Sequence, residues 1–270
     1  MKVLITNDDG IHAPGLWAAV EALRDAGEVY VVAPDRDQSG VGASLTLHAP
    51  IRARQVPPSA GIGDGVMAYS VEGTPGDACV LALENLVGPV DLVVSGINRG
   101  SNLGQDTLVS GTVGAALHAH MRGYATVAIS VAAVNDTRYD VACAFLRMLI
   151  RSLVGGAALP PSLINVNIPN EPAHKIEGLA VTRLGLCSYT ESVTEEEDGM
   201  RRYYWISRNT PVHQDTGEGS DIWALAHNLI SVTPIHTGLT DEIQMPTLED
   251  LFKGCASELL ASVDPGDVGG

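Results

Sequence analysis

The first ten residues, MKVLITNDDG (1–10), place a short apolar run directly before two adjacent carboxylates. A run of this kind predicts a buried strand, and Asp8 and Asp9 then lie where that strand ends. Two neighbouring negative charges repel each other, so a stable fold needs a cation, strong hydrogen bonds or full exposure to water at this point. The rest of the chain indicates which of these applies.

Four further apolar runs have the same character and alternate with helical patterns. Apolar residues that recur at intervals of three and four predict helices at about 15–26, 76–87, 111–122 and 138–154. This alternation is typical of parallel βαβ units, and near-continuous apolar runs are expected for strands that are covered on both faces. The expected strands are VLIT (3–6), VYVVA (29–33), VDLVVS (90–95), ATVAISV (125–131) and LINVNI (163–168).

Two segments depart from this alternation. Residues 42–72 carry prolines and the run GIGDG, which predicts an excursion of short strands or loops. The stretch SYTESVTEEEDGMRRYYWISRN has a charged turn, Glu195 to Gly199, between two β-prone runs and predicts a long projecting hairpin. A return strand at 229–235 and a closing helix near 246–261 follow. We therefore expect a catalytic domain at 1–184 and an extension at 185–270 that packs on another subunit.

Composition narrows the class of protein. The chain of 270 residues is 45% hydrophobic, which is enough for a substantial core. Its formal charge of −16 argues against binding of nucleic acid or anionic membranes, because neutralising phosphates requires a basic surface. No apolar run reaches the roughly 18 residues of a membrane span, and no signal peptide precedes the first strand, so we expect a cytoplasmic protein. The four cysteines are widely spaced, which fits neither a zinc site nor a disulfide framework.

Oxygen-bearing side chains follow three of the expected strands, in NDDG (7–10), PDRDQSG (34–40) and GINRGSNLG (96–104). Because the carboxyl ends of parallel strands meet at one edge of a sheet, these segments should come together there. Carboxylate, hydroxyl and amide oxygens are the ligands that Mg²⁺ and Mn²⁺ prefer, and the metal would supply the missing cation. For the Asp pair alone, a turn in which one Asp caps the next helix is the alternative. The candidate ligands are Asp8, Asp9, Ser39, Asn98 and Asn102.

The segment SGTVGAALHAH (110–120) begins with a Ser-Gly-Thr turn at an expected helix start. Backbone N–H groups, the positive end of the helix dipole and two hydroxyls favour a phosphate there, although the same pattern is also an ordinary helix cap. No P-loop, complete dinucleotide fingerprint or GxSxG elbow occurs. Position 11 is Ile, where a phosphatase with a nucleophilic Asp needs a second Asp, so attack by metal-bound water is favoured.

An ordered set of motifs extends from residue 1 to about residue 240. In order they are NDDG (7–10), APG (13–15), VVAPDRDQSG (31–40), GTPGD (73–77), SGINRGSNLG (95–104), SGTVGAA (110–116), NVNIP (165–169) and SVTP (231–234). Together they resemble the survival protein SurE family of metal-dependent nucleotidases. The resemblance implies a Rossmann-like three-layer α/β/α sandwich, with a C-terminal hairpin and helix extension that swaps between subunits in a homodimer or homotetramer.

The same resemblance implies hydrolysis of nucleoside monophosphates at the 5′ or 3′ position, with one divalent metal ion per subunit. The metal ligands it implies are Asp8, Asp9, Ser39 and Asn98. The phosphate would be held by Asn98, Asn102, Ser110, Gly111 and Thr112. The alternatives are a polyphosphate-directed phosphatase, a non-catalytic nucleotide sensor and a metal-dependent transferase that uses a nucleotide-linked donor.

The chain departs from the family pattern away from these ligands. Val109 replaces a usual Tyr, His118 a common Glu and Ala125 a common Pro, which leaves the substrate preference open. Arg36 and Arg99 lie in the oxygen-rich segments. The favoured interpretation is that both are surface arginines, and the alternative is that they help to balance charge at the site.

Overall fold

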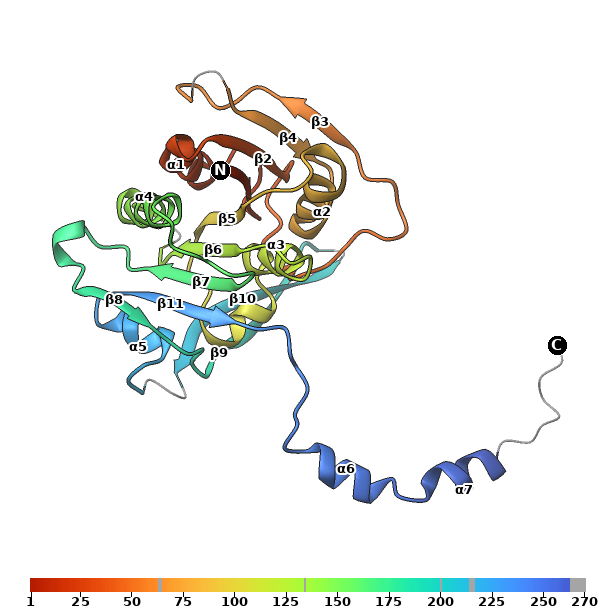
Figure 1. Cartoon of the computed structure of the whole chain (residues 1–270). Helices are drawn as coiled ribbons and strands as arrows, with labels where there is room; N and C mark the ends of the chain where they lie inside the picture. Colours follow the sequence, from red (N-terminus) through yellow and green to blue (C-terminus); the bar gives the residue numbers. More distant parts are fainter. Residues whose placement is uncertain (63–64, 134, 200, 214–216, 263–270) are drawn as a thin grey trace. The chain divides into compact units, whose positions relative to one another are not determined.

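The computed structural model describes residues 1–62, 65–133, 135–199, 201–213 and 217–262 (Figure 1). The chain divides into two compact units, Met1–His236 and Thr237–Gly270. The predicted division at residue 185, between a catalytic domain and an extension exchanged between subunits, stays a prediction. Among the described residues, no helix is both long enough and apolar enough to cross a lipid bilayer.

A nine-stranded sheet forms the centre of the first unit. In spatial order its strands are β3 (Ala53–Val56), β4 (Met67–Val71), β2 (Glu28–Pro34), β1 (Lys2–Thr6), β5 (Leu92–Arg99), β6 (Thr126–Val131), β7 (Leu163–Ile168), β11 (Leu229–Ile235) and β8 (Gly178–Val181). The strands from β4 to β7 in this order are all parallel, while β3 and β11 run antiparallel to β4 and β7. All five strands predicted from apolar runs are confirmed.

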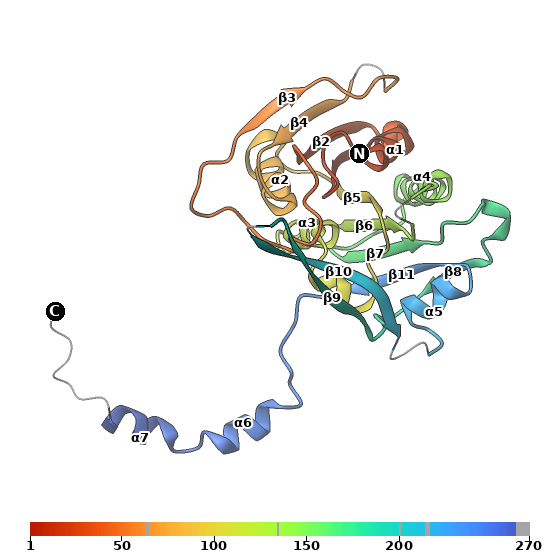
Figure 2. The ribbon, with the colours of Figure 1, turned by 180° about the vertical axis from the view of Figure 1, so that it is seen from behind.

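Helices cover both faces of this sheet (Figures 1 and 2). On one face α1 (Pro14–Leu23) packs against α4 (Asp140–Val154), and on the other α2 (Pro75–Leu81) packs against α3 (Gly111–His120). Strand β1 packs against both helical layers. Val3 and Ile5 belong to the core with α1 and α4, and Leu4 belongs to the core with α2 and α3. All three side chains are fully buried. The continuous apolar run therefore reflects a strand covered on both faces, and the predicted α/β/α sandwich is confirmed.

Strand β5 extends beyond its predicted end at Ser95. Its pairing with β6 shifts by one residue after Ser95 and resumes with Asn98 opposite Ser130. An extra residue of this kind bends a strand and redirects its side chains. Asn98 and Arg99 therefore close the strand, whereas the sequence pattern placed them in a loop.

The predicted hairpin is confirmed as β9 (Cys187–Glu197) and β10 (Arg202–His213), which pair antiparallel in a separate two-stranded sheet. Its turn was predicted from Glu195, but β9 continues to Glu197 because Glu195 and Glu196 still pair with Tyr204 and Tyr203. A short helix that the sequence pattern did not predict, α5 (Asp221–Ala226), lies between β10 and β11.

The described residues of the second unit form two helices where one was expected near 246–261. They are α6 (Met245–Leu251) and α7 (Cys255–Ser262). Gly254 lies between them with a φ of +84°, a left-handed conformation that ends a helix and that glycine adopts without a steric penalty.

Asp77 ties the excursion between β2 and β4 to the start of α2. Its carboxylate accepts hydrogen bonds from the Thr46 N–H (2.9 Å), the Thr46 hydroxyl (2.6 Å) and the Thr74 N–H (2.9 Å). The Thr74 hydroxyl accepts in turn from the Asp77 N–H, which completes a capping box. Burial alone would raise the pKa of Asp77, but these hydrogen bonds outweigh burial and lower it.

Asp77→Asn is expected to reduce the free energy of unfolding by about 1.5–3 kcal/mol at pH 7, the range for hydrogen bonds to a charged group. Because the folded-state pKa is depressed, this stabilisation is present above the ordinary carboxyl pKa and is lost as the pH falls through the folded value. Urea unfolding at neutral and acidic pH measures both effects. Equal stability of the two proteins at pH 7 would contradict the assignment.

Candidate active site

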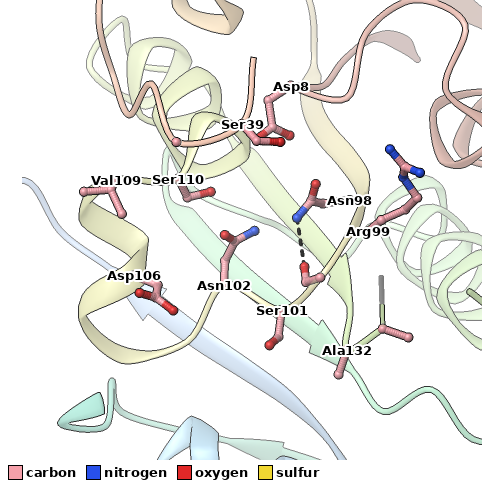
Figure 3. A pocket seen from close by; sticks show the side chains of 13 residues that line it. Asp8, Ser39, Asn98, Arg99, Ser101, Asn102, Asp106, Val109, Ser110 and Ala132 are labelled. Atoms are coloured by element: carbon pink, nitrogen blue, oxygen red, sulfur yellow. Dashed lines mark hydrogen bonds between the residues drawn. The ribbon is translucent and has the colours of Figure 1, made fainter. Parts of the chain in front are cut away.

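A cavity of about 380 Å³ opens at the carboxyl edge of the parallel strands (Figure 3). Strand β1 lies between β2 and β5, so the order in which the chain adds strands reverses there. Open α/β sheets bind ligands at such a reversal, and the cavity lies at this point. Of the predicted site residues, Asp8, Ser39, Asn98, Asn102 and Ser110 line it. The structure thus brings together side chains from three strand ends and from the start of α3, as the motifs predicted.

Asp8 is buried at the floor of this site, with an exposed fraction of 4%. The Thr112 hydroxyl donates a hydrogen bond of 2.5 Å to its Oδ1 atom. Loss of hydration raises the pKa of Asp8 to about 6; the charge of Asp9 adds to the rise, and the bond from Thr112 opposes it. A Cβ atom on Gly111 would lie only 2.7 Å from the Cβ of Asp8, so the first turn of α3 packs directly on this carboxylate.

Asp9 faces a different partner. Its carboxylate accepts from the Arg99 backbone N–H (3.3 Å), Nε (3.4 Å) and guanidinium NH2 (3.3 Å). Burial raises the pKa of Asp9, and its bonds and charge contact with Arg99 limit the rise. The two carboxylates are therefore accommodated differently, Asp8 by hydrogen bonds and Asp9 by a cation. Arg99 is exposed, with a side-chain exposed fraction of 41%, as a surface arginine is expected to be. It also lines the cavity and pairs with Asp9, because β5 lies beside β1 and brings residue 99 to residue 9.

Asn98 and Ser39 turn oxygen atoms toward Asp8 (Figure 3). The Asn98 Nδ2 atom donates to the Gly100 carbonyl (2.8 Å), which leaves its Oδ1 on the side of Asp8. The Ser39 hydroxyl donates to Asp37 (2.6 Å), so its oxygen lone pairs remain available. Oxygen atoms from the ends of β1 and β5 and from the segment after β2 thus converge, a donor set that fits a hard divalent cation.

The described residues contain no group of three or more His, Cys, Asp or Glu side chains arranged to hold a metal ion. A site made from Asp8, Ser39 and Asn98, with Asp9 beside it, has at most two carboxylates and relies on neutral oxygens. This composition is compatible with Mg²⁺, which binds through one or two carboxylates and keeps several water ligands.

Asn102 is held in place by polar side chains of the neighbouring strands. Its Nδ2 donates to Ser130 (2.8 Å), and its backbone carbonyl oxygen accepts from the side chains of Asn165 (2.7 Å) and Asn167 (3.0 Å). Both β7 asparagines are fully buried, and the sequence pattern predicted no role for them. Their spacing is the sequence signal that was missed, because two asparagines at alternate positions of an otherwise apolar strand lie on the same face of the sheet.

Ser110 begins α3 at the opposite side of the cavity from Arg99 (Figure 3). Its hydroxyl accepts from the Val113 N–H (3.1 Å), so the residue is the N-cap of the helix. The positive end of the α3 dipole therefore lies beside Asp8 and the cavity, where it favours an anion.

Comparisons with known proteins show which family the chain belongs to. A family model described as Survival protein SurE matches residues 3–191. The chain belongs to the SurE family. It is 42% identical over 255 residues to the 5'-nucleotidase SurE of Dehalococcoides mccartyi strain CBDB1, an alignment that covers 93% of this chain and 94% of that protein. It is 41% identical over 241 residues to the 5'-nucleotidase SurE of Legionella pneumophila, with coverage of 89% and 92%. The crystal structure of the SurE protein from Aquifex aeolicus superposes with a TM-score of 0.77 at 34% identity and covers 93% of this chain and 99% of that one.

The departures from the SurE pattern have different structural roles. Val109 lines the cavity next to Ser110 and is 40% exposed. His118 is buried outside the cavity, where its Nε2 atom lies 2.9 Å from the Ala43 carbonyl oxygen. Of these two, only Val109 is placed to contact a ligand in the SurE site. The roles of Asp8, Asp9, Ser39 and Asn98 as metal ligands, and of the Ser110 turn as a phosphate site, stay predictions.

Proposed function

We propose that this chain is a metal-dependent 5′/3′-nucleotidase that hydrolyses nucleoside monophosphates to nucleoside and phosphate. The relatives named 5'-nucleotidase SurE support the reaction class. The observation that carries the proposal is the buried carboxylate of Asp8, which faces oxygen atoms of Ser39 and Asn98 in one cavity. That cavity, of about 380 Å³, lies within the usual range for a small-molecule ligand.

One divalent ion per subunit, Mg²⁺ or Mn²⁺, would be held by Asp8, Asp9, Ser39 and Asn98. When bound, such an ion polarises a phosphoryl oxygen and lowers the pKa of a coordinated water. The free Oδ1 of Asn98 and the buried, hydrogen-bonded carboxylate of Asp8 support this assignment. For Asp9, the assignment requires that its carboxylate bind the metal ion and Arg99 at the same time.

The remaining roles in phosphoryl transfer belong to the side chains around the cavity. We assign the proton of the attacking water to Asp8 or Asp9; on Asp8, the Oδ2 atom does not accept from Thr112, which supports Asp8. The start of α3 and the side chain of Asn102 stabilise the charge on the phosphoryl oxygens. The alanines at 132 and 133 also line the cavity, and we assign them contact with the nucleoside.

Assembly into a homodimer or homotetramer is part of the proposal. The hairpin carries exposed apolar side chains, Val193, Trp205 and Ile206 among them, each more than half exposed. In the second unit, Leu251 and Phe252 are exposed to a similar degree. Such residues are ordinarily covered when a stable complex forms, and the hairpin and the second unit both belong to the extension predicted at 185–270.

Phosphate release from a panel of nucleoside 5′- and 3′-monophosphates tests the function. Protein stripped with EDTA should release no phosphate, and Mn²⁺ or Mg²⁺ should restore the activity. Nucleotide binding without release would indicate a sensor. Turnover of a nucleotide-linked donor without free phosphate would indicate a transferase, and release from polyphosphate alone would indicate a polyphosphatase. Each of these three results would contradict the proposal.

A further inference from the structure

Asp221 is a fully buried carboxylate that the proposed chemistry does not use. It is the first residue of α5, and its two oxygens accept from the backbone N–H groups of Gly104 (2.8 Å), Gly185 (2.8 Å) and Ile222 (2.9 Å). Among the residues that the structure describes, no ion pair includes Asp221. A buried charge with no cation costs free energy, so these hydrogen bonds must offset its lost hydration.

The two carboxylate oxygens connect separate parts of the chain. Oδ2 accepts from Gly104, in the segment 101–110, and Oδ1 accepts from Gly185, directly before the β9–β10 hairpin. An Asn side chain could not make both connections, because it has one acceptor oxygen and its NH₂ group would oppose an N–H donor. A single carboxylate therefore joins the base of the hairpin to the segment that carries Asn102.

The segment 101–110 shapes the cavity, since Ser101, Asn102 and Ser110 all line it. Its first part is held at Asn102 by the asparagines of β7. Gly104 begins a 3₁₀ helix, Gly104–Leu108, which contacts β9 and leads to the start of α3. The hydrogen bond from Gly104 to Asp221 is thus the second fixed point of this segment, two residues after the first.

We propose that Asp221 is a positioning residue that fixes the segment 101–110 along the cavity and couples its path to the base of the β9–β10 hairpin. The kinetic consequence rests on the proposed function, whereas the coupling itself does not. Because Asn102 and Ser110 face the phosphate end of the cavity, loosening the segment weakens substrate binding. The oxygen atoms of Asp8, Ser39 and Asn98 come from other elements, so metal binding stays unchanged.

Two variants disturb this connection from opposite sides. Asp221→Asn keeps the shape of the side chain and removes one acceptor. Gly185→Ala leaves Asp221 in place but adds a Cβ 2.6 Å from Cδ1 of Ile222 and 3.1 Å from Oδ1 of Asp221. The control is Thr182→Val, which removes buried hydrogen bonds to Ser231 (2.8 Å) and Thr233 (2.7 Å) in the same region without touching Gly104.

The experiment compares the three variants with wild type by phosphate release, Mn²⁺ titration calorimetry and hydrogen exchange. Asp221→Asn and Gly185→Ala should raise the KM for a nucleoside monophosphate about tenfold or more, since small displacements of positioning groups have effects of this order. Exchange should accelerate in the peptide that spans 101–110, while Mn²⁺ affinity stays within about twofold of wild type. Thr182→Val should leave both KM and exchange in that peptide unchanged.

Wild-type KM together with wild-type exchange at 101–110 in a folded Asp221→Asn protein would overturn the proposal. Acceleration spread equally over the whole sheet would overturn it too, because Asp221 would then be a general stabilising residue. If Asp221→Asn does not fold, Gly185→Ala decides by the same measurements. If wild type releases no phosphate, the proposed function fails, and hydrogen exchange alone decides whether the coupling exists.

Discussion

Asp8→Asn is expected to lower phosphate release by about a thousandfold or more. Asp8 lines the cavity beside Ser39 and Asn98, whereas Asp106, the other carboxylate of the lining, belongs to the segment 101–110. A metal contributes several kcal/mol to stabilising the transition state of a phosphoryl transfer, and each ~1.4 kcal/mol corresponds to a factor of ten in rate. Turnover with saturating Mn²⁺, set against a Mn²⁺ titration of the same protein, separates lost chemistry from lost metal affinity.

The same substitution is expected to stabilise the metal-free protein at neutral pH. Burial raises the pKa of Asp8 to about 6, so the folded state prefers the protonated form. This contribution is fully present below the ordinary carboxyl pKa and is lost as the pH rises through about 6. In EDTA, Asp8→Asn should therefore melt at a higher temperature than wild type at pH 7.5 and at a similar temperature near pH 4.

Asp25→Asn is the matched control, because Asp25 is an exposed carboxylate in the 3₁₀ turn Arg24–Ala26, outside the cavity. It should change neither turnover nor the melting temperature. Near-wild-type turnover of Asp8→Asn would refute the metal assignment. A lower melting temperature at pH 7.5 in EDTA would show instead that the charged carboxylate stabilises the fold.

Gly111→Ala is expected to lower phosphate release by about a hundredfold, the effect of misplacing a catalytic group by about 1 Å. The added Cβ would lie 2.7 Å from the Asp8 Cβ, 2.9 Å from its Oδ2 and 3.2 Å from Cγ of Pro75. None of these atoms is the free end of a flexible side chain, so either Asp8 or the start of α3 must move. The helix itself should persist, because alanine is the better helix former.

Thr112→Ser is the control for this site. It keeps the hydroxyl that donates to Asp8 and removes only a methyl group, so turnover should stay within a few-fold of wild type. Circular dichroism and melting temperatures establish that Gly111→Ala is folded. Full activity in that variant would show that Asp8 can shift without consequence, and the close packing of α3 on Asp8 would then have no catalytic role.

The sequence predicted the elements and the edge of the sheet better than it predicted individual contacts. Apolar runs identified the five main parallel strands, and the rule for parallel sheets correctly predicted that Asp8, Ser39 and Asn98 lie at one edge. Local patterns decide these features. The end of β5 was predicted too early because a shift of one residue in pairing leaves no signal in composition.

The missed contacts share a physical cause, since each joins residues that are far apart in the sequence. The ion pair of Arg99 with Asp9 requires β1 and β5 to lie side by side. The bonds from Asn167 to Asn102 require β7 to lie two strands from β5. A single sequence carries no direct record of such pairings, so the partners of Arg99, Asn167 and Asp221 became clear only in the fold.

The order of strands in the sheet has a consequence for the growing polypeptide on the ribosome. Strand β1 pairs with β5 through Val3 and Leu92, and Asp8 meets Thr112 only after α3 has been made. An emerging chain therefore exposes Asp9 for 90 residues before Arg99 is made, and Asp8 for 104 residues before Thr112 is made. Nascent fragments that lack Thr112 should neither capture a metal ion nor consume cellular nucleotides, so the activity is withheld at least until β5 and the start of α3 have been made.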